Sequence, residues 1–193
     1  GNNYFRSVSL FIDSNDEVHI TWSYSFNYYC YLYYALFNIK SETWSFPPET
    51  VIMNTYYDEY YPAICAVEKA GAVEPLIVYM YDEYDHLYCA TRDSLSGTWS
   101  IKSIYTTGTV GEQISIDVSS IGRIYTSFYE KDGKDLMYAT RAPNDTLWAI
   151  GYIDITGDVG YYNSIVIDEN DIPHVVYYDA TNGDLKYAKV IAP

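Results

Sequence analysis

A four-residue motif recurs in register along the 193-residue chain and constrains its fold more than any other feature. Each copy starts with Leu and ends with Ala. The four copies are Leu32–Ala35, Leu87–Ala90, Leu136–Ala139 and Leu185–Ala188. Their alanines are 55, 49 and 49 residues apart, and a period of roughly 40 to 50 residues is typical of proteins that repeat one small β-sheet. The chain is therefore four tandem copies of one unit.

Two segments of β-strand type precede each copy of the motif. The first is apolar and ends in an acid, and it occurs at Ser9–Asp13, Ile64–Glu68, Ile114–Asp117 and Ser164–Asp168. The second alternates with the two-residue period of a sheet, and it occurs at His19–Trp22, Leu76–Tyr79, Tyr125–Tyr129 and His174–Tyr178. With the motif itself as a third strand, each unit predicts an antiparallel meander.

A tryptophan follows the motif alanine by nine residues in the first three units, at Trp44, Trp99 and Trp148. We expect each to open a fourth, outer strand, and units with four strands are typical of propeller blades. The sequence therefore predicts an all-β fold, a single β-propeller domain over residues 1–193. Its blades cover approximately 8–55, 63–106, 114–155 and 164–190, and the last lacks its outer strand. Both a four-bladed ring and a part of a larger ring fit this count.

The fourth unit carries a resemblance to known proteins. The run from Ser164 to Asp179, followed by Leu185–Ala188, resembles blades of extracellular β-propeller repeat proteins of bacteria and archaea. The segment Asp93–Trp99 is distantly similar to the Asp-box of sialidase-type repeats, since it falls between a third and an outer strand. The resemblance implies an extracellular or cell-surface location and a role as a lectin, an adhesin, a surface-layer part or, less often, a glycosidase.

Charge excludes two classes of partner. The chain has 26 acidic residues against 11 Lys and Arg, a formal charge of −15. Such a surface repels phosphate backbones and anionic lipid headgroups, so we expect no nucleic-acid partner. No apolar run reaches the roughly 18 to 20 residues of a membrane-spanning helix, so we expect no membrane insertion.

No metal or cofactor is expected. The three cysteines, Cys30, Cys65 and Cys89, lack metal-type spacing and are interpreted as core residues. The acidic runs Asp13–Asp16 and Asp168–Asp171 offer several oxygens, so calcium remains an alternative to plain hairpin turns. His19 and His174 start equivalent strands, which indicates a structural role.

Tyrosine is the strongest functional hint, with 25 copies. Exposed Tyr beside Asp can stack on sugar rings and bond to their hydroxyls. The candidate ligand-binding residues are Tyr57, Asp58, Tyr60, Tyr81, Asp82 and Tyr84. Arginines occur only at positions 6, 92, 123 and 141 and form no convergent triad for a carboxylate.

The function expected from these features is therefore a non-catalytic extracellular binding module, which recognises glycans or a protein surface, and not an enzyme. One alternative is a self-assembling structural subunit of an extracellular filament or surface layer. Another is a sialidase-like glycoside hydrolase, in which two of the many carboxylates flank a glycosidic bond.

The unpaired edge of the last blade, at Asp184–Val190, predicts an assembly contact. We expect the segment Asn2–Ser7 to cover it, either from the same chain or from a neighbour by strand addition. The candidate assembly residues are Asn2, Asn3, Tyr4, Phe5, Asp184, Leu185, Lys186 and Tyr187. Asn144 opens a glycosylation sequon, Asn-Asp-Thr, in an expected turn.

Overall fold

The computed structural model describes residues 4–26, 29–54, 60–69, 71–81 and 85–190. These residues form strands and turns, and no helix able to cross a membrane occurs among them. The strands of the first half are β1 (Tyr4–Ile12), β2 (Glu17–Phe26), β3 (Tyr29–Asn38), β4 (Thr43–Trp44), β5 (Glu49–Asn54), β6 (Ala63–Lys69), β7 (Ala72–Tyr81) and β8 (His86–Arg92). Those of the second half are β9 (Trp99–Tyr105), β10 (Val110–Val118), β11 (Ile124–Glu130), β12 (Asp135–Arg141), β13 (Ala149–Asp154), β14 (Val159–Ile167), β15 (Pro173–Asp179) and β16 (Asp184–Lys189).

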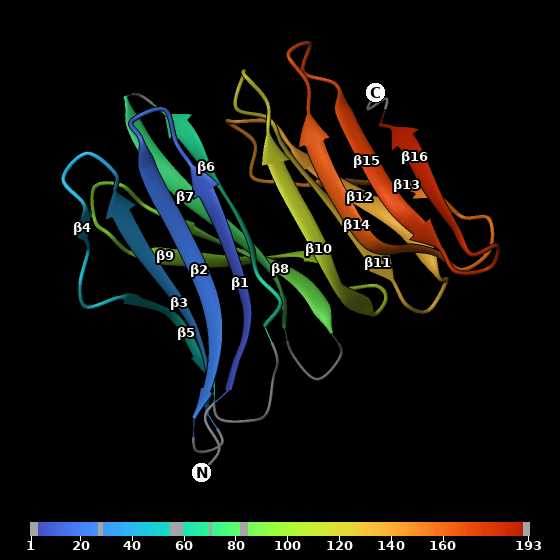
Figure 1. Cartoon of the computed structure of the whole chain (residues 1–193), viewed down its shortest axis with the longest axis horizontal. Helices are drawn as coiled ribbons and strands as arrows, with labels where there is room; N and C mark the ends of the chain where they lie inside the picture. The colour runs from blue at the N-terminus through green and yellow to red at the C-terminus, as the bar shows by residue number, and fades with distance from the viewer. Residues whose placement is uncertain (1–3, 27–28, 55–59, 70, 82–84, 191–193) are drawn as a thin grey trace. The chain divides into compact units, whose positions relative to one another are not determined.

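The strands form four small sheets in which neighbours in the sequence are neighbours in space (Figure 1). Blade 1 has the order β1-β2-β3-β4, and β5 also pairs with β3; blade 2 is β6 to β9; blade 3 is β10 to β13; blade 4 is β14 to β16. The all-β propeller fold is confirmed. The described part of blade 4 has three strands, as the missing outer strand predicted.

The chain divides into two compact units. Unit 1 comprises residues 1–83 and 88–102 and contains blade 1 with most of blade 2. Unit 2 comprises residues 84–87 and 103–193 and contains blades 3 and 4. Each unit is described by itself below, and the single domain over residues 1–193 stays a prediction.

The alternation of side chains gives blade 1 two different faces. On β3, Leu32 and Tyr34 are buried, whereas Tyr31 and Tyr33 point the opposite way and stack on each other with ring centroids 5.5 Å apart. The buried face of β3 packs on blade 2. Of the four tyrosines of this strand, only Tyr34 is therefore core, and Tyr31 and Tyr33 lie on the opposite face of the blade.

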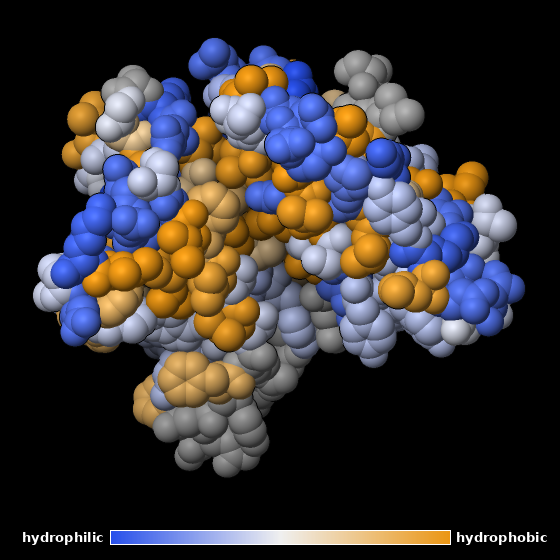
Figure 2. Space-filling model, turned by 45° about the horizontal axis from the view of Figure 1, so that its top comes forward, coloured by the Kyte–Doolittle hydropathy of each residue, from blue (hydrophilic) through white to orange (hydrophobic). Residues whose placement is uncertain are grey.

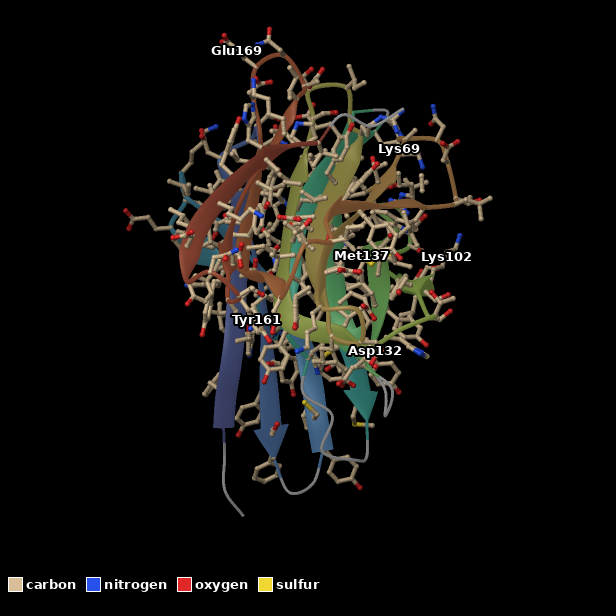
Figure 3. The ribbon with its side chains drawn as sticks, turned by 90° about the vertical axis from the view of Figure 1, so that its right-hand side faces the viewer. Lys69, Lys102, Asp132, Met137, Tyr161 and Glu169 are labelled. Carbon is tan, nitrogen blue, oxygen red and sulfur yellow. The ribbon has the colours of Figure 1, made fainter. Side chains whose placement is uncertain are left out.

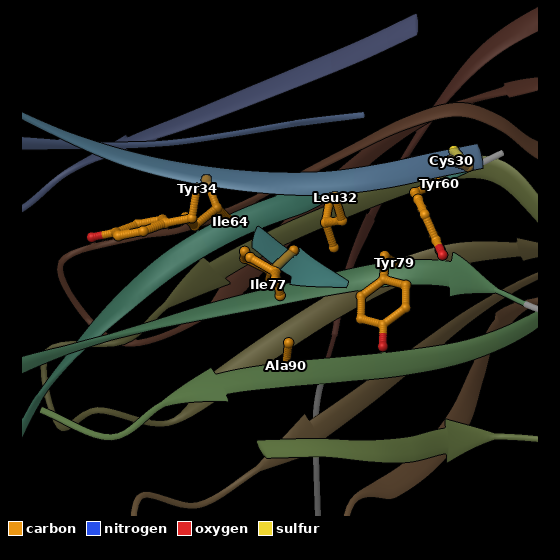
Figure 4. Packing of buried hydrophobic residues seen from close by; sticks show 9 residues of the cluster. Cys30, Leu32, Tyr34, Tyr60, Ile64, Ile77, Tyr79 and Ala90 are labelled. Carbon is orange, nitrogen blue, oxygen red and sulfur yellow. The ribbon is translucent and has the colours of Figure 1, made fainter. Parts of the chain in front are cut away.

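The core of unit 1 lies between blades 1 and 2 (Figure 4). Its buried members are Cys30, Leu32, Tyr34, Val51, Tyr60, Ile64, Ile77, Tyr79 and Ala90. Trp99 of blade 2 packs edge-on against Tyr34 of blade 1, with ring centroids 5.3 Å apart. All three cysteines are buried, as expected for core residues.

The core of unit 2 lies between blades 3 and 4 and is built in the same way. Its buried members are Tyr125, Leu136, Val159, Ile165, Val175, Tyr177 and Val190. The same kind of side-chain bond also links adjacent first strands in both units. The Ile64 amide donates to Ser9 Oγ at 3.2 Å in unit 1, and the Ile165 amide donates to Ser115 Oγ at 3.1 Å in unit 2.

The first strands of blades 1, 3 and 4 start earlier than the sequence predicted, and each is irregular near its start. The register shifts between Phe5 and Val8 in β1, between Val110 and Ile114 in β10, and twice between Val159 and Ser164 in β14. The described part of the predicted edge-covering segment, Tyr4 to Ser7, belongs to β1 and pairs with β2.

Candidate functional site

Unit 2 carries a group of tyrosines and acids where β14 begins. We call it the tyrosine–acid cluster, and it consists of Tyr129, Glu130, Asp132, Lys134, Asp158, Tyr161 and Tyr162. In Figure 3, Tyr161 and Asp132 lie near one end of the unit 2 strands, and Glu169 marks the opposite end.

The backbone of β14 is bulged where the cluster forms. Gly160 has a φ of 113°, and a Cβ on it would lie 3.0 Å from the Leu136 side chain and 3.1 Å from the Leu136 Cα. Only glycine fits this conformation and this close approach. Bulges turn side chains in directions that a regular strand does not allow, and they are frequent beside active sites.

Tyr162, two residues after Gly160, is the most unusual residue of the bulge. Its φ of 52° lies in the left-handed region, which bulky side chains rarely adopt, and its side chain is 76% exposed. Strained residues of this kind persist where the surroundings fix them, and they are concentrated at functional sites. The strain presents an aromatic ring to solvent.

Asn163 fixes the bulge from inside. Its side chain is buried, and its Oδ1 accepts a hydrogen bond of 2.6 Å from Ser127 Oγ. Its Nδ2 donates to the carbonyl oxygens of Gln113 at 3.0 Å and Gly160 at 3.1 Å. All three neighbours are therefore tied to the bulge, because a buried amide group must keep its partners.

Two tyrosines and an aspartate form a hydrogen-bonded chain in the cluster. Tyr129 donates to Asp158 Oδ1 at 2.9 Å, and its hydroxyl lies 3.0 Å from that of Tyr161. The two rings are 4.2 Å apart. A carboxylate only accepts and a hydroxyl has one proton to give. Since the Tyr129 proton goes to Asp158, Tyr161 supplies the proton between the two hydroxyls.

Burial raises the pKa of Tyr129, and its hydrogen bonds to Tyr161 and Asp158 act in the same direction. Tyr129 therefore stays protonated at neutral pH and can pass a proton only by receiving one. The chain from Tyr161 through Tyr129 to Asp158 is a path along which a proton can be relayed.

The lysines of the cluster region are already paired with acids. Lys134 Nζ lies 3.7 Å from Asp158 Oδ2, and Lys131 Nζ lies 2.7 Å from Asp85 Oδ2. Glu130 is buried, and its carboxylate accepts the Gly133 amide at 2.6 Å, which shapes the hairpin. The surroundings are therefore polar and acidic, which suits sugar hydroxyls better than an anionic ligand.

Two of the six predicted ligand-binding residues, Tyr60 and Tyr81, lie within the described part of the chain. Tyr57, Asp58, Asp82 and Tyr84 lie outside the described residues. Tyr60 is fully buried, so its prediction as an exposed ligand contact is wrong. Tyr81 is partly buried, and its ring stacks on that of Tyr60 at 5.7 Å.

The predicted assembly residues lie partly outside the described ranges and partly in β1 and β16. Asn2 and Asn3 lie outside the described residues, whereas Tyr4 and Phe5 are in β1. Leu185 and Tyr187 are exposed on β16 beside Asp184, and Lys186 bonds to Asp154 of blade 3. Asn144 is exposed, and its glycosylation stays a prediction.

A second polar group, Asp-His-Tyr, occurs in both units at the opposite end of the first strands. In blade 1, His19 bonds to Tyr34 at 2.8 Å and to Asp13 at 3.4 Å. In blade 4, His174 bonds to Tyr187 at 2.5 Å and to Asp168 at 3.1 Å. The repetition supports the structural role expected for the two histidines.

The acidic turns that were considered for calcium bind their own backbone. Asp13 accepts the amides of Asn15 and Glu17, and Asp168 accepts those of Asn170 and Ile172. These are hairpin turns of the kind that Asp side chains stabilise. Within the described ranges, no three His, Cys, Asp or Glu side chains are grouped to hold a metal ion.

Arg92, one of the arginines for which the sequence predicted no convergent triad, forms an ion pair within unit 1. Its guanidinium pairs with both oxygens of Glu49 at 2.8 Å, and Trp99 Nε1 donates to the same carboxylate at 2.9 Å. A bidentate pair of this kind links the outer strand of blade 1 to blade 2. Arg92 is therefore part of the blade interface.

No protein-family model matches the chain, and a search of curated proteins found no similar sequence. Solved structures are similar in fold. A polysaccharide lyase, described as a PL25 ulvan lyase, has a TM-score of 0.64 at 12% identity and covers 94% of this chain. This chain covers 54% of that protein, about half its length.

Two glycosidases have the same fold. A GH43 β-xylosidase/α-arabinofuranosidase from a compost microbial metagenome, solved with xylotriose, has a TM-score of 0.55 at 14% identity, and the match covers 98% of this chain and 74% of the enzyme. An α-L-arabinofuranosidase from Lactobacillus brevis has a TM-score of 0.53 at 9% identity, with 95% and 71% covered. These likenesses show a common fold.

The comparisons correct one expectation. The sequence predicted a binding module that is not an enzyme. The three solved structures described above are two glycosidases and a polysaccharide lyase, which contradicts the expectation that the chain is not an enzyme. A relation to carbohydrates is common to these three proteins.

Proposed function

We propose that this chain is the propeller domain of a glycoside hydrolase that cleaves a neutral glycan, with the tyrosine–acid cluster of unit 2 as its site. The observation that carries the proposal is the hydrogen-bonded chain of Tyr161, Tyr129 and Asp158. It lies beside Tyr162, an exposed ring in a strained bulge. The glycosidases that share the fold support the reaction class.

Five residues of the cluster have a role in this proposal. Tyr162 stacks on a sugar ring, because its exposed face is aromatic and apolar. Asp158 acts as the general base on water, oriented by Tyr129 and kept near Lys134. We assign the second carboxyl that such hydrolases need to Asp132, an exposed residue of the hairpin after β11 whose Oδ2 accepts the Thr109 amide at 3.0 Å.

Charge favours a neutral glycan over an anionic one. The chain has a formal charge of −15, and Lys131 and Lys134 already face Asp85 and Asp158. A lyase that works by β-elimination removes a proton beside a carboxyl group, so its substrate is anionic. The net negative charge of the chain would repel such a substrate. Hydrolysis is therefore the reaction that fits.

The test is cleavage of a substrate panel by the purified 193-residue chain. Neutral xylan, arabinan and arabinoxylan are compared with anionic polysaccharides. New reducing ends are measured together with the ultraviolet absorbance of unsaturated sugars. The proposal expects reducing ends from a neutral glycan without that absorbance. Absorbance from an anionic glycan, or no cleavage of any substrate, would contradict it.

A further inference from the structure

Asp158 is held by its backbone as well as by its carboxylate. Its amide donates to Thr181 Oγ1 at 2.7 Å, and its carbonyl oxygen accepts the Ala180 amide at 2.8 Å. Thr181 and Ala180 both lie in the hairpin between β15 and β16 of the same blade. One hairpin therefore binds both backbone groups of Asp158. We call this arrangement the blade 4 clamp, and the Thr181 hydroxyl is the part of it that a side chain supplies.

The hairpin that forms the clamp has a fixed shape of its own. Asp179 is 1% exposed, and its carboxylate accepts the Asn182 amide at 3.0 Å and Asn182 Nδ2 at 2.8 Å. Its carbonyl oxygen accepts the Gly183 amide at 2.8 Å. Thr181 is exposed, and hydrophilic side chains form much of the outer edge at the right of Figure 2, the side where β15 and β16 lie in Figure 1. Hydrogen bonds therefore give the Thr181 hydroxyl its defined position.

The loop before β14 is shaped to receive Thr181. Gly157 has a φ of 93°, and a Cβ on it would lie 2.6 Å from Thr181 Oγ1 and 3.0 Å from Thr181 Cβ. A side chain at this position would therefore push Thr181 away from the Asp158 amide. On the other side of Asp158, the Val159 amide donates to the Lys134 carbonyl oxygen at 3.0 Å. Asp158 is thus fixed between the hairpins of blades 3 and 4.

Blade 3 has the same clamp with the chemical groups exchanged. The Thr109 amide donates to Asp132 Oδ2 at 3.0 Å, and the Thr109 carbonyl oxygen accepts the Lys131 amide at 2.7 Å. In both blades the clamped residue is followed by Val-Gly, so Thr109 is the counterpart of Asp158, and Asp132 is the counterpart of Thr181. The clamp is therefore a feature of the repeat. Of these two clamps, only that of blade 4 holds a residue with a carboxylate.

We infer that Thr181 is the positioning residue of Asp158 in hydrolysis, an inference that rests on the proposed function. The Asp158 carboxylate accepts from Tyr129 at 2.9 Å and lies 3.7 Å from Lys134 Nζ. A backbone rotation at Asp158 would move the carboxylate away from both groups and from the water that it activates. A displacement of about 1 Å can lower a rate about 100-fold. Thr181 acts through Asp158 and not on the substrate, so kcat depends on it more than KM does.

The test compares the kinetics of two Thr181 variants on the best neutral substrate. Thr181→Val keeps the shape of the side chain but lacks the acceptor, and it is expected to lower kcat about 10-fold while KM stays within about twofold. Thr181→Ser keeps the hydroxyl and is expected to retain at least about half of the wild-type kcat. Thr156→Val is the matched control, because Thr156 is an exposed threonine of the loop that carries Asp158. It is expected to match the wild type.

Hydrogen exchange of the Asp158 amide, followed by NMR, measures the clamp without any substrate. This amide is expected to exchange at least about 10-fold faster in Thr181→Val than in the wild type and Thr181→Ser, whereas the amides of β15 keep their rates. An unchanged exchange rate, or a wild-type kcat in Thr181→Val, would overturn the positioning role and leave the proposed hydrolase intact. So would equal losses of kcat in Thr181→Val and Thr181→Ser. A wild-type chain that cleaves no substrate would instead overturn the proposed function, and the inference with it.

Discussion

The Asp-His-Tyr groups of blades 1 and 4 have the same residues and nearly the same bonds, but their surroundings differ. Asp13 and His19 are buried, and Tyr34 is covered by Trp99. Asp168 and His174 are partly exposed, and Tyr187 is exposed. The sequence of one blade sets the internal geometry of the group, and the neighbouring blade sets its burial. Equivalent substitutions should therefore have unequal effects.

The largest difference is expected for the motif leucines. Leu32→Ala empties a buried site and should lower the free energy of unfolding by about 3 kcal/mol. Leu185→Ala changes an exposed side chain and should lower it by less than about 0.5 kcal/mol. Urea unfolding measures both losses. Equal losses would mean that Leu185 is as buried in solution as Leu32.

A smaller difference is expected for the tyrosine hydroxyls. Tyr34→Phe leaves the buried Nδ1 of His19 without its partner at 2.8 Å, which should cost about 1 to 3 kcal/mol of unfolding free energy. Tyr187→Phe leaves His174 able to bond to water, and its cost should be under about 1 kcal/mol. Thermal unfolding of the two variants and of the wild type measures both losses of unfolding free energy. A cost at Tyr187 that matches the cost at Tyr34 would contradict the role of burial.

His19 makes the free energy of unfolding depend on pH. Burial lowers the pKa of His19, although the carboxylate of Asp13 acts in the opposite direction. The unfolded chain therefore binds a proton more readily, so stability is complete above about pH 6.5 and falls as the pH decreases. Unfolding free energies between pH 5 and 8 should show a shallower slope in His19→Gln than in the wild type. An unchanged slope would contradict the buried, neutral histidine.

The smallest effect is expected at the turn of blade 4. The amide of Ile172 and the ring of His174 bond to Asp168 and lower its pKa to about 2. This carboxylate contributes stability above its unfolded pKa of about 4, and the contribution disappears as the pH falls through about 2. Carboxyl carbon shifts in an NMR titration report the value. A midpoint near 4 would mean that the turn bonds are absent in solution.

The repeat made most of the fold predictable, because strand alternation and the fixed distances from the motif are local properties. The equivalence of His19 and His174 was visible for the same reason. The hydrogen bonds from these histidines to Tyr34 and Tyr187 could not be predicted, because each bond joins side chains of two different strands. The early starts of β10 and β14 were also missed, because bulges interrupt the two-residue period.

The candidate site was less predictable than the fold. The tyrosine-rich runs led us to predict ligand-binding residues between Tyr57 and Tyr84, but Tyr60 of this region is a core residue. The cluster of unit 2 joins Tyr129 to Asp158 and Tyr161, about 30 positions later, through the irregular start of β14. Gly160 was the one local signal, since a glycine inside a strand often marks a bulge.

The most direct test of the proposed site compares two acids at opposite ends of unit 2. Asp158 belongs to the tyrosine–acid cluster, and Glu169 is an exposed turn residue at the far end (Figure 3). On the best neutral substrate, Asp158→Asn should lower kcat/KM by at least about 100-fold, as expected for loss of a general base. Glu169→Gln should leave kcat/KM unchanged. Wild-type activity in Asp158→Asn would contradict the account.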